Sequence, residues 1–219
     1  MPDRPQLPAQ LTSTGVVAIA RASSAHKVVT AVETLVDAGI SCLELTLTMP
    51  SAIDNIAVLV ELLGESACVG AGTVLTTQQA RECIGAGAKF IVAPSAVPEV
   101  VEFASAQGIP VLPGALTPSE IVASWLAGAA AVKVFPASTV GPQYLRDVRA
   151  PLPGIPLIPT GGVTIDEVPR YLDAGAVAVG MGSPLFGDAL RDDGDLRALA
   201  TRAKRLLDAV RVGREGRPV

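Results

Sequence analysis

The lysine in the segment AAVKVFP, residues 130–136, is the residue of this sequence best suited to chemistry. Its apolar neighbours predict a buried strand, and lysine is rarely buried without a partner. Apolar surroundings favour the neutral amine of a lysine, and a neutral amine can attack a carbonyl carbon to form a Schiff base. The alternative is a salt bridge that only fills polar space in the core. We favour a nucleophilic Lys133, since an apolar side chain fills a core at lower cost.

The segment LELTLT, residues 43–48, supplies a carboxylate in a second apolar run. Side chains alternate along a strand, so Glu44, Thr46 and Thr48 share one face. A carboxylate that lies near an amine and is partly shielded from water can act as a general acid and base. We therefore predict that Glu44 transfers protons during the reaction of Lys133. A purely structural ion pair between Glu44 and Lys133 remains the alternative.

Two glycine-rich segments, PTGGV (159–163) and GMGS (180–183), are candidate anion sites. Glycines let backbone N–H groups approach an anion closely, and the start of a helix favours negative charge. The first segment is followed by TIDE (164–167), which predicts a capping box at a helix start. In the second, Pro184 predicts a short helical turn. Together the two segments predict a phosphate site.

The elements that must position these residues follow from a repeat of glycines. Eight glycines recur at nearly regular intervals, namely Gly15, Gly39, Gly64, Gly87, Gly108, Gly128, Gly154 and Gly175. Each precedes a short apolar run, and these runs are 16–20, 42–47, 67–74, 90–94, 110–115, 131–135, 156–162 and 176–182. The stretches between them have helical periodicity, often with Ser, Thr or Pro near the start and Gly at the end.

Strand, loop, helix and glycine repeated eight times predict an α/β fold, a single-domain (β/α)8 barrel over residues 1–219. Continuous apolar strands agree with a parallel sheet buried on both faces. Residues 1–14 are expected to form an N-terminal extension. The last helix is predicted over 195–210, and residues 211–219 as a mobile tail. An open doubly wound sheet is the alternative, although the regular spacing shows no switch point.

A barrel of this kind places its active site at the carboxyl ends of the strands. This rule selects Arg21, Glu44, Thr73 and Lys133, and it puts the two glycine-rich segments after strands seven and eight, a common phosphate position. Lys89 precedes its strand, so we expect a surface lysine at the opposite end. The single histidine, His26, falls at the start of the first helix and is expected at the surface.

Composition excludes several other classes of function. The 219 residues are 49% apolar and carry a net charge of −4, with no basic run outside the C-terminus, which argues against nucleic-acid binding. The N-terminal residues have no apolar core of a signal peptide, so no secretory signal is expected, and no apolar run reaches the ~18 residues of a membrane span. Cys42, Cys68 and Cys83 lack CxxC spacing and are expected to be reduced core residues of a cytoplasmic protein. No metal-ligand spacing occurs, so neither metal nor cofactor is expected.

The motifs LELTLT, GAGTVLT, FIVAPS, VKVFPAS, GPQYL, PTGGV and GMGS resemble, in this order, those of the 2-keto-3-deoxy-6-phosphogluconate aldolase family, also known as 4-hydroxy-2-oxoglutarate aldolases. The resemblance extends over about residues 16–209. It implies a class I aldolase barrel, a 2-keto acid substrate and a homotrimer. It also implies roles for individual residues: Lys133 as Schiff base, Glu44 as general acid/base, Thr73, Pro94 and Phe135 in the substrate pocket, and Gly161, Gly162, Gly182 and Ser183 around the phosphate.

One position departs from the family pattern. Many members have a substrate-contacting arginine where this chain has Thr48, and Arg21 could supply that charge from the neighbouring strand. The expected activity is cleavage of 2-dehydro-3-deoxy-6-phosphogluconate to pyruvate and glyceraldehyde 3-phosphate, with 4-hydroxy-2-oxoglutarate as a further substrate. Alternatives are a C4-epimeric substrate, another phosphate-binding barrel enzyme such as an epimerase or synthase, and an assembly scaffold derived from the trimer.

Overall fold

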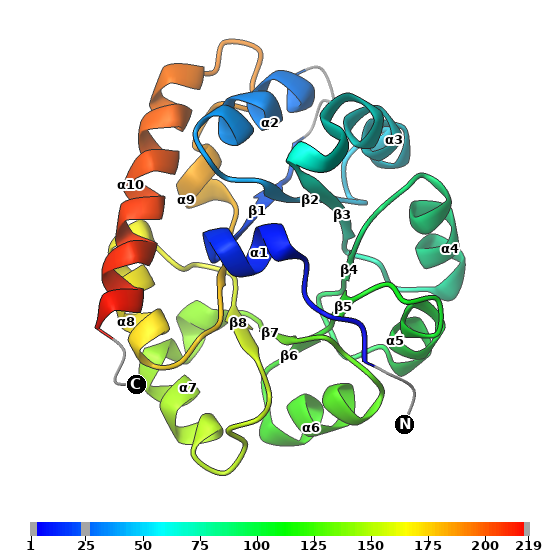
Figure 1. Cartoon of the computed structure of the whole chain (residues 1–219), viewed down its shortest axis with the longest axis vertical. Coiled ribbons are helices and arrows are strands. Elements are labelled where there is room, and N and C mark those ends of the chain that lie inside the picture. Colours follow the sequence, from blue (N-terminus) through cyan, green and yellow to red (C-terminus); the bar gives the residue numbers. More distant parts are fainter. Residues whose placement is uncertain (1–3, 23–26, 217–219) are drawn as a thin grey trace.

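The strands of the protein form a closed parallel ring with helices around its outside (Figure 1). The computed structural model describes residues 4–22 and 27–216. The strands are β1 (Val16–Ala20), β2 (Cys42–Thr46), β3 (Cys68–Gly72), β4 (Ile91–Val92), β5 (Val111–Leu112), β6 (Gly114–Ala115), β7 (Val132–Val134), β8 (Leu157–Pro159) and β9 (Val179–Met181). The helices are α1 (Ala9–Thr14), α2 (Val28–Asp37), α3 (Ala52–Leu63), α4 (Thr77–Gly85), α5 (Pro98–Ser105), α6 (Pro118–Leu126), α7 (Gly141–Arg149), α8 (Val168–Asp173), α9 (Ser183–Phe186) and α10 (Leu196–Glu215).

The ring closes through two parallel sheets that meet at two seams. One sheet has the order β5-β4-β3-β2-β1-β9 and the other the order β6-β7-β8. They join at one seam because β5 and β6 are one chain segment, and at the other because Thr160 and Gly180 form a parallel bridge. The predicted (β/α)8 barrel is therefore confirmed, and the open doubly wound alternative is wrong.

The fifth predicted strand is divided in two at Pro113. Proline has no N–H to donate to a ladder, so pairing on one side stops there. The Pro113 carbonyl still accepts a hydrogen bond of 2.9 Å from the backbone N–H of Lys133. Val111, before the proline, thus pairs with β4, and Gly114, after it, pairs with β7. The same chain segment therefore belongs to one sheet before Pro113 and to the other sheet after it.

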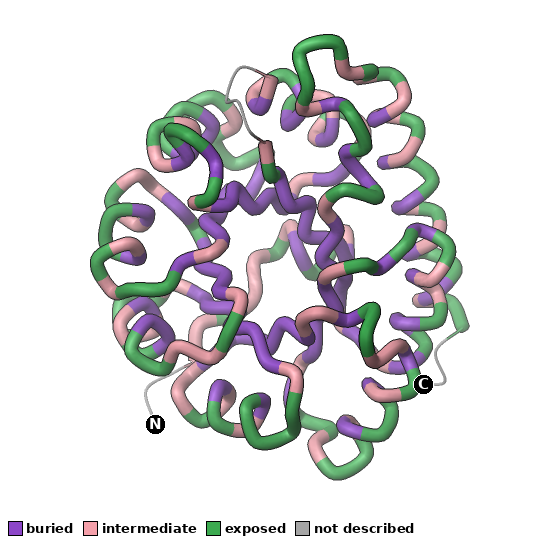
Figure 2. Tube along the Cα trace, turned by 180° about the vertical axis from the view of Figure 1, so that it is seen from behind, coloured by how far each residue is buried: buried purple, intermediate pink, exposed green. Residues whose placement is uncertain are grey.

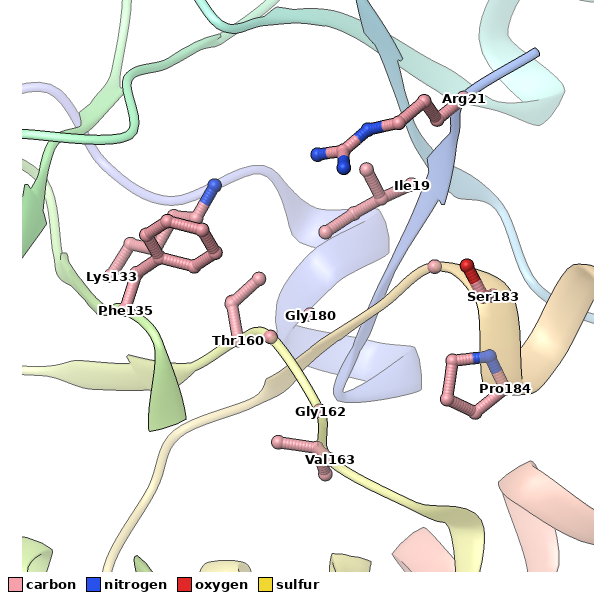
Figure 3. Close-up of a pocket in the computed structure, with 12 residues that line it drawn as sticks. Ile19, Arg21, Lys133, Phe135, Thr160, Gly162, Val163, Gly180, Ser183 and Pro184 are labelled. Atoms are coloured by element: carbon pink, nitrogen blue, oxygen red, sulfur yellow. The ribbon is translucent and has the colours of Figure 1, made fainter. Parts of the chain in front are cut away.

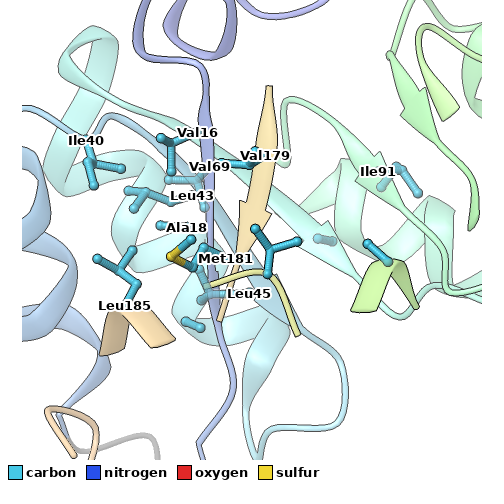
Figure 4. Packing of buried hydrophobic residues seen from close by; sticks show 14 of the residues in the cluster. Val16, Ala18, Ile40, Leu43, Leu45, Val69, Ile91, Val179, Met181 and Leu185 are labelled. Atoms are coloured by element: carbon cyan, nitrogen blue, oxygen red, sulfur yellow. The ribbon is translucent and has the colours of Figure 1, made fainter. Parts of the chain in front are cut away.

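Buried side chains form two layers, separated by the wall of the barrel. Strand residues such as Val16, Leu43 and Val179 point outward and pack against the helices (Figure 4). Alternate residues such as Val17, Phe90 and Ile158 point inward and fill the barrel. Figure 2 shows that buried residues run along the strands and along the inner faces of the helices.

Several helix starts have the caps that the sequence predicts. The Thr117 and Glu120 side chains form a capping box at α6, and Thr164 and Glu167 form another before α8. The Thr76 hydroxyl accepts a 3.1 Å hydrogen bond from the N–H of Gln79 at the start of α4. These caps satisfy N–H groups that a helix leaves without partners and so fix where each loop at the carboxyl end of the barrel ends.

The last helix ends later than residue 210, the end that the sequence predicted. The last helix, α10, continues to Glu215 because the Arg214 guanidinium donates to the carbonyls of Thr12 and Ser13, at 2.7 and 2.6 Å. These bonds tie α10 to α1, which lies across the amino-terminal end of the barrel with Leu11 buried in the barrel interior (Figure 1). The predicted N-terminal extension thus includes a helix that covers the barrel. No helix in the described ranges is long and apolar enough to cross a membrane.

One buried hydroxyl on α6 leads to a stability prediction. The Ser124 side chain is 2% exposed, and its hydroxyl is the buried side-chain polar atom that lacks a hydrogen-bond partner within the described ranges. An unpaired buried hydroxyl costs about 1–3 kcal/mol. We expect Ser124→Ala to raise the free energy of unfolding by about 1 kcal/mol, measured by urea denaturation.

A matched control lies on the neighbouring helix. The Ser105 hydroxyl donates a 3.1 Å hydrogen bond to the Gly128 carbonyl after α6. Ser105→Ala removes a formed bond and is expected to lower stability by about 1 kcal/mol. Equal signs for the two substitutions would contradict this interpretation of Ser124.

Candidate active site

A cavity of about 360 Å³ opens at the carboxyl end of the barrel (Figure 3). Its volume is at the small end of the range of about 300–1,000 Å³ for ligand sites. The lining residues lie within β1, β7 and β9 or directly after β1, β7, β8 and β9: Ile19, Arg21, Lys133, Phe135, Thr160, Gly161, Gly162, Val163, Gly180, Gly182, Ser183 and Pro184. The cavity therefore lies at the end of the barrel where the sequence predicted the active site.

Lys133 reaches this cavity from the middle of β7. Its residue is only 8% exposed, and its ammonium lies 4.9 Å from the centre of the Phe135 ring, so the two inward-facing side chains lie together. Figure 3 shows the Lys133 amine and the Arg21 guanidinium directed toward the same space. The amine can thus meet a ligand in the cavity while the rest of its side chain is shielded from water.

Glu44 lies on β2, with Ile19 and Gly70 beside it on the neighbouring strands. The residue is 2% exposed. Gly72 leaves room for its carboxylate, because a Cβ at that position would overlap the Glu44 side chain. Burial raises the pKa of the Glu44 carboxyl above its ordinary range, and the charges of Lys133 and Arg21 act in the opposite direction. A raised pKa suits a group that must both take up and release a proton.

Glu44 and Lys133 do not form the structural salt bridge considered from the sequence. The ion pairs within 4.0 Å among residues 4–22 and 27–216 all lie on the surface, and none includes either residue. The Glu44 carboxylate also has no hydrogen bond to another described residue, although buried charged groups normally have partners. The two groups interact through space across the barrel interior. This arrangement leaves both free to act on a ligand.

The two glycine-rich loops border the other side of the cavity. Gly161 and Gly162 have φ angles of 88° and 76°, which glycine adopts without strain. A side chain at Gly161 would clash with the Phe135 ring. In the described ranges, the backbone N–H groups of Gly161, Gly162 and Ser183 donate to no backbone carbonyl. Ser183 begins α9, the short helix predicted at Pro184. These donors are therefore available to an anion.

The structure brings seven of the eleven predicted site residues to the cavity wall and leaves four away from it. The seven are Arg21, Lys133, Phe135, Gly161, Gly162, Gly182 and Ser183. Of the others, Glu44 lies in the barrel interior and interacts electrostatically with Lys133 and Arg21. Thr48 is exposed, and its hydroxyl lies 2.9 Å from that of Thr46. Pro94 is half-buried beyond the end of β4.

Thr73 is half-buried after β3 and has a backbone conformation that is rare for its residue type. Its φ is 61°, in the left-handed region. A β-branched residue there is strained, and such strain concentrates at functional sites. The strained backbone supports a role for Thr73 next to the site, although its side chain does not line the cavity.

Sequence reasoning missed Thr160, Ile19, Gly180, Val163 and Pro184. Thr160 is the polar side chain among them and is 5% exposed, and its hydroxyl donates a long 3.4 Å hydrogen bond to the Ile158 carbonyl. Gly180 on the neighbouring strand makes room for it. Side chains two residues apart on a strand share a face, so Thr160 shares the inner face with Ile158. The segment PTGGV therefore already indicated that Thr160 faces the barrel interior.

Residues predicted to lie away from the site are away from it, where the structure describes them. Lys89 is exposed at the amino-terminal end of the barrel, next to a separate cavity lined by Gln6 and Gln10. His26 lies outside the described residues. Among those that are described, no three His, Cys, Asp or Glu residues are grouped to hold a metal ion.

A closed parallel barrel with a buried lysine, a buried carboxylate and free backbone N–H groups at the carboxyl ends of its strands has the arrangement of a barrel enzyme. Residues 7–201 match the aldolase family described as KDPG and KHG aldolase. The chain belongs to this family, so it is a carbon–carbon lyase of the aldolase type.

Named relatives agree with this assignment. The chain is 35% identical over 176 residues to 2-dehydro-3-deoxy-6-phosphogalactonate aldolase of Escherichia coli K12, covering 80% of this chain and 86% of the relative. A solved structure described as native KDPGal superposes with a TM-score of 0.88 at 32% identity, covering 96% of this chain and 99% of that chain. The KDPG aldolase of Legionella pneumophila, solved with pyruvate captured as a covalent carbinolamine, gives 0.77 at 25% identity and covers 93% and 96%.

Proposed function

We propose that this protein cleaves a 6-phosphorylated 2-keto-3-deoxy sugar acid to pyruvate and glyceraldehyde 3-phosphate through a Schiff base on Lys133, without a metal ion. The observation that carries the proposal is the pair of buried, oppositely charged groups, Glu44 and Lys133, which have no ion-pair partner among the described residues. Burying two charges without direct pairing costs stability, and a catalytic use accounts for that cost. A substrate that enters between them would meet a nucleophile and a proton carrier.

The reaction begins with attack of the neutral Lys133 amine on the C2 ketone. Loss of water from the resulting carbinolamine gives an iminium ion, which withdraws electrons from the C3–C4 bond. The covalent carbinolamine in the Legionella pneumophila relative supports this chemistry for the family. Because the Nζ atom of Lys133 lies 4.9 Å from the centre of the Phe135 ring, the attacking atom is on the inward face of β7.

Glu44 is the proton carrier of the proposed reaction. Its carboxylate takes the proton of the C4 hydroxyl, directly or through a water, as the C3–C4 bond breaks and glyceraldehyde 3-phosphate leaves. The electron pair of that bond forms an enamine with Lys133. Protonation of the enamine at C3 and hydrolysis of the iminium then release pyruvate and the free amine.

The phosphate and the carboxylate of the substrate bind on opposite sides of the cavity. The backbone N–H groups of Gly161, Gly162 and Ser183, with Gly182 beside them, hold the phosphate, because free donors at glycine loops suit an anion. Arg21 lies on the other side of the cavity, as Figure 3 shows, and binds the carboxylate.

Thr73 and Pro94 complete the pocket around the pyruvyl end of the substrate. Both follow strands at the carboxyl end of the barrel, and the strained Thr73 backbone supports that place. Neither lines the cavity, so these two assignments rest on the family resemblance.

The C4 configuration of the substrate is a separate part of the proposal. The sequence pointed to the gluconate epimer, with 4-hydroxy-2-oxoglutarate as a further substrate. Thr48 cannot supply the charge of the arginine found in many family members, whereas Arg21 lies at the cavity, and the Escherichia coli relative is named for the galactonate epimer. We therefore place 2-dehydro-3-deoxy-6-phosphogalactonate first and the gluconate epimer second.

A substrate panel tests this proposal. We expect pyruvate release from both phosphorylated epimers, with the higher kcat/KM for the galactonate. For their dephosphorylated forms and for 4-hydroxy-2-oxoglutarate, kcat/KM should be lower by about 10²-fold. These compounds lack a phosphate that could accept hydrogen bonds from the free N–H groups. Equal rates for phosphorylated and dephosphorylated forms would contradict the phosphate assignment. No pyruvate from any of these compounds would contradict the proposed reaction.

The assembly state is also proposed. Val58 and Leu62 on α3, and Leu75 before α4, are exposed apolar side chains, which suit burial against another copy of the chain. We propose the homotrimer that the family resemblance implies, and the mass in solution by light scattering tests it. The cytoplasmic location stays a prediction from the sequence.

A further inference from the structure

Two cysteines lie together inside the barrel at the end opposite the candidate active site. Cys42 begins β2, Cys68 begins β3, and the two residues are direct partners in the parallel register. Both side chains belong to the inward-facing cluster that fills the barrel, and both are free thiols. Their thiols are close enough to be hydrogen-bonded to each other. No step of the proposed aldol reaction uses either of them.

Their position is compatible with a disulfide bond without movement of the backbone. Neighbouring strands lie about 4.7–4.9 Å apart, and disulfides join residues whose Cα atoms are about 4.4–6.8 Å apart. Partners in register on adjacent strands, with side chains on the same face, meet this requirement. Oxidation would therefore join β2 to β3 in the arrangement they already have.

The two thiols differ in access and in ionisation. Cys68 lines a cavity of about 280 Å³ at the amino-terminal end of the barrel, with Lys89 and Glu65 among its other walls. The hydrogen bond from Cys42 and the nearby charge of Lys89 lower the pKa of the Cys68 thiol, against burial and Glu65. Cys42 is fully buried behind it, and burial raises its pKa. A thiol that lines a cavity, beside a second thiol that is fully buried, is the arrangement of an attacking and a resolving cysteine.

We propose that Cys42 and Cys68 form a reversible oxidation site whose co-substrate is a small peroxide that enters the cavity beside Lys89. The Cys68 thiolate attacks one peroxide oxygen, the O–O bond breaks, and hydroxide or alkoxide leaves with the proton lost by Cys68. The Cys42 thiol then attacks the sulfenic acid of Cys68 and expels water, so two thiols and one hydrogen peroxide give one disulfide and two waters. A small thiol reductant restores the pair.

The third cysteine provides an internal control. Cys83 on α4 is buried in the outer core layer, lines none of the cavities described above, and has no second cysteine beside it. Burial raises the pKa of its thiol to about 11. Cys83 should therefore stay reduced under conditions that oxidise the pair.

The experiment uses the full chain treated with a modest excess of hydrogen peroxide. Thiols that remain after the treatment are blocked with a first label during denaturation. Disulfides are then reduced, the released thiols receive a second label, and mass spectrometry of the peptides locates both labels. We expect the second label on Cys42 and Cys68 in equal amounts, within a chain that stays monomeric on a non-reducing denaturing gel, and the first label on Cys83. A second label on Cys83, or a reduced Cys68, would overturn the proposal.

Two single substitutions separate the roles of the thiols. In Cys42→Ala the sulfenic acid of Cys68 has no resolving partner, so a dimedone adduct should appear at Cys68. In Cys68→Ala the Cys42 thiol should remain reduced. Oxidation of Cys42 at the same rate in the absence of Cys68 would contradict the order of steps. Alanine is chosen because a buried serine hydroxyl would itself destabilise the barrel.

Discussion

Reduction with borohydride in the presence of pyruvate is expected to attach the reduced pyruvyl group to Lys133 and to no other lysine. In the proposed mechanism the Schiff base forms at the amine that is buried beside Phe135 and lines the cavity, and hydride converts the iminium into a stable secondary amine. Peptide mass spectrometry locates the adduct. An adduct on Lys27 or Lys89 in its place would contradict the proposed mechanism.

Lys133→Met should abolish both the adduct and the cleavage activity. We expect a loss of at least about 10⁴-fold in kcat, which corresponds to ~5 kcal/mol, because no other lysine is among the described residues that line the cavity. The chain should still fold, since methionine replaces a buried ammonium with an apolar side chain of similar length. Lys204→Met, on the exposed face of α10, is the matched control and should keep adduct and activity.

The same pair of experiments separates the rival functions. An epimerase or synthase in which Lys133 acts only through its charge would give no borohydride adduct, and Lys133→Arg would then keep part of its activity. A scaffold without catalysis would form neither an adduct nor pyruvate. The proposed aldolase forms both, and Lys133→Arg is inactive because a guanidinium stays protonated.

Glu44→Gln is expected to lower kcat by about 10²–10⁴-fold, the usual contribution of a general acid and base. The amide cannot accept the C4 hydroxyl proton, whereas the amine of Lys133 remains. Slow formation of the pyruvyl adduct should therefore persist in this variant, which separates loss of proton transfer from loss of the nucleophile. An unchanged kcat would contradict the role of Glu44.

The same substitution should change how stability depends on pH. Burial raises the pKa of Glu44 in the folded chain above its ordinary value of 4.5. The stability contributed by the neutral carboxyl is fully present below pH 4.5 and is lost as the pH rises through the raised pKa of the folded chain. Glutamine cannot ionise, so Glu44→Gln should gain free energy of unfolding relative to the native chain between pH 4 and pH 8.

Urea denaturation at the two pH values measures this difference. Glu61→Gln, on the exposed side of α3, is the matched control and should show no such gain. A relative loss of stability in Glu44→Gln at pH 8 would mean that the carboxylate is well stabilised by its surroundings. That result would favour a structural role for Glu44.

The sequence by itself determined the order of the elements and the end of the barrel that holds the site. Eight apolar runs after eight glycines predicted the strands, because a parallel strand buried on both faces leaves a continuous apolar run. Alternation placed Lys133 and Phe135 on one face, and TIDE and Pro184 predicted helix starts that the structure contains. These features depend on residues that are close together in the sequence, so the local sequence is enough to predict them.

Only the tertiary structure decided which of these residues meet. Whether Glu44 and Lys133 form a salt bridge depends on distances across the barrel, which are fixed by register and closure rather than by spacing along the chain. The division of the fifth strand at Pro113 and the extension of α10 to Glu215 depend on partners that are distant in the sequence, namely β7 and the carbonyls of Thr12 and Ser13.

Closure of the barrel also brings into contact residues that are distant in the sequence and belong to no common motif. Thr160 reached the cavity because Gly180, on the neighbouring strand, leaves room for its side chain. Cys42 and Cys68 are separated in the sequence by a whole helix, α3, and became neighbours because β2 and β3 align at their first residues. Local patterns determine which face a side chain occupies, whereas only the assembled ring determines what lies opposite that face.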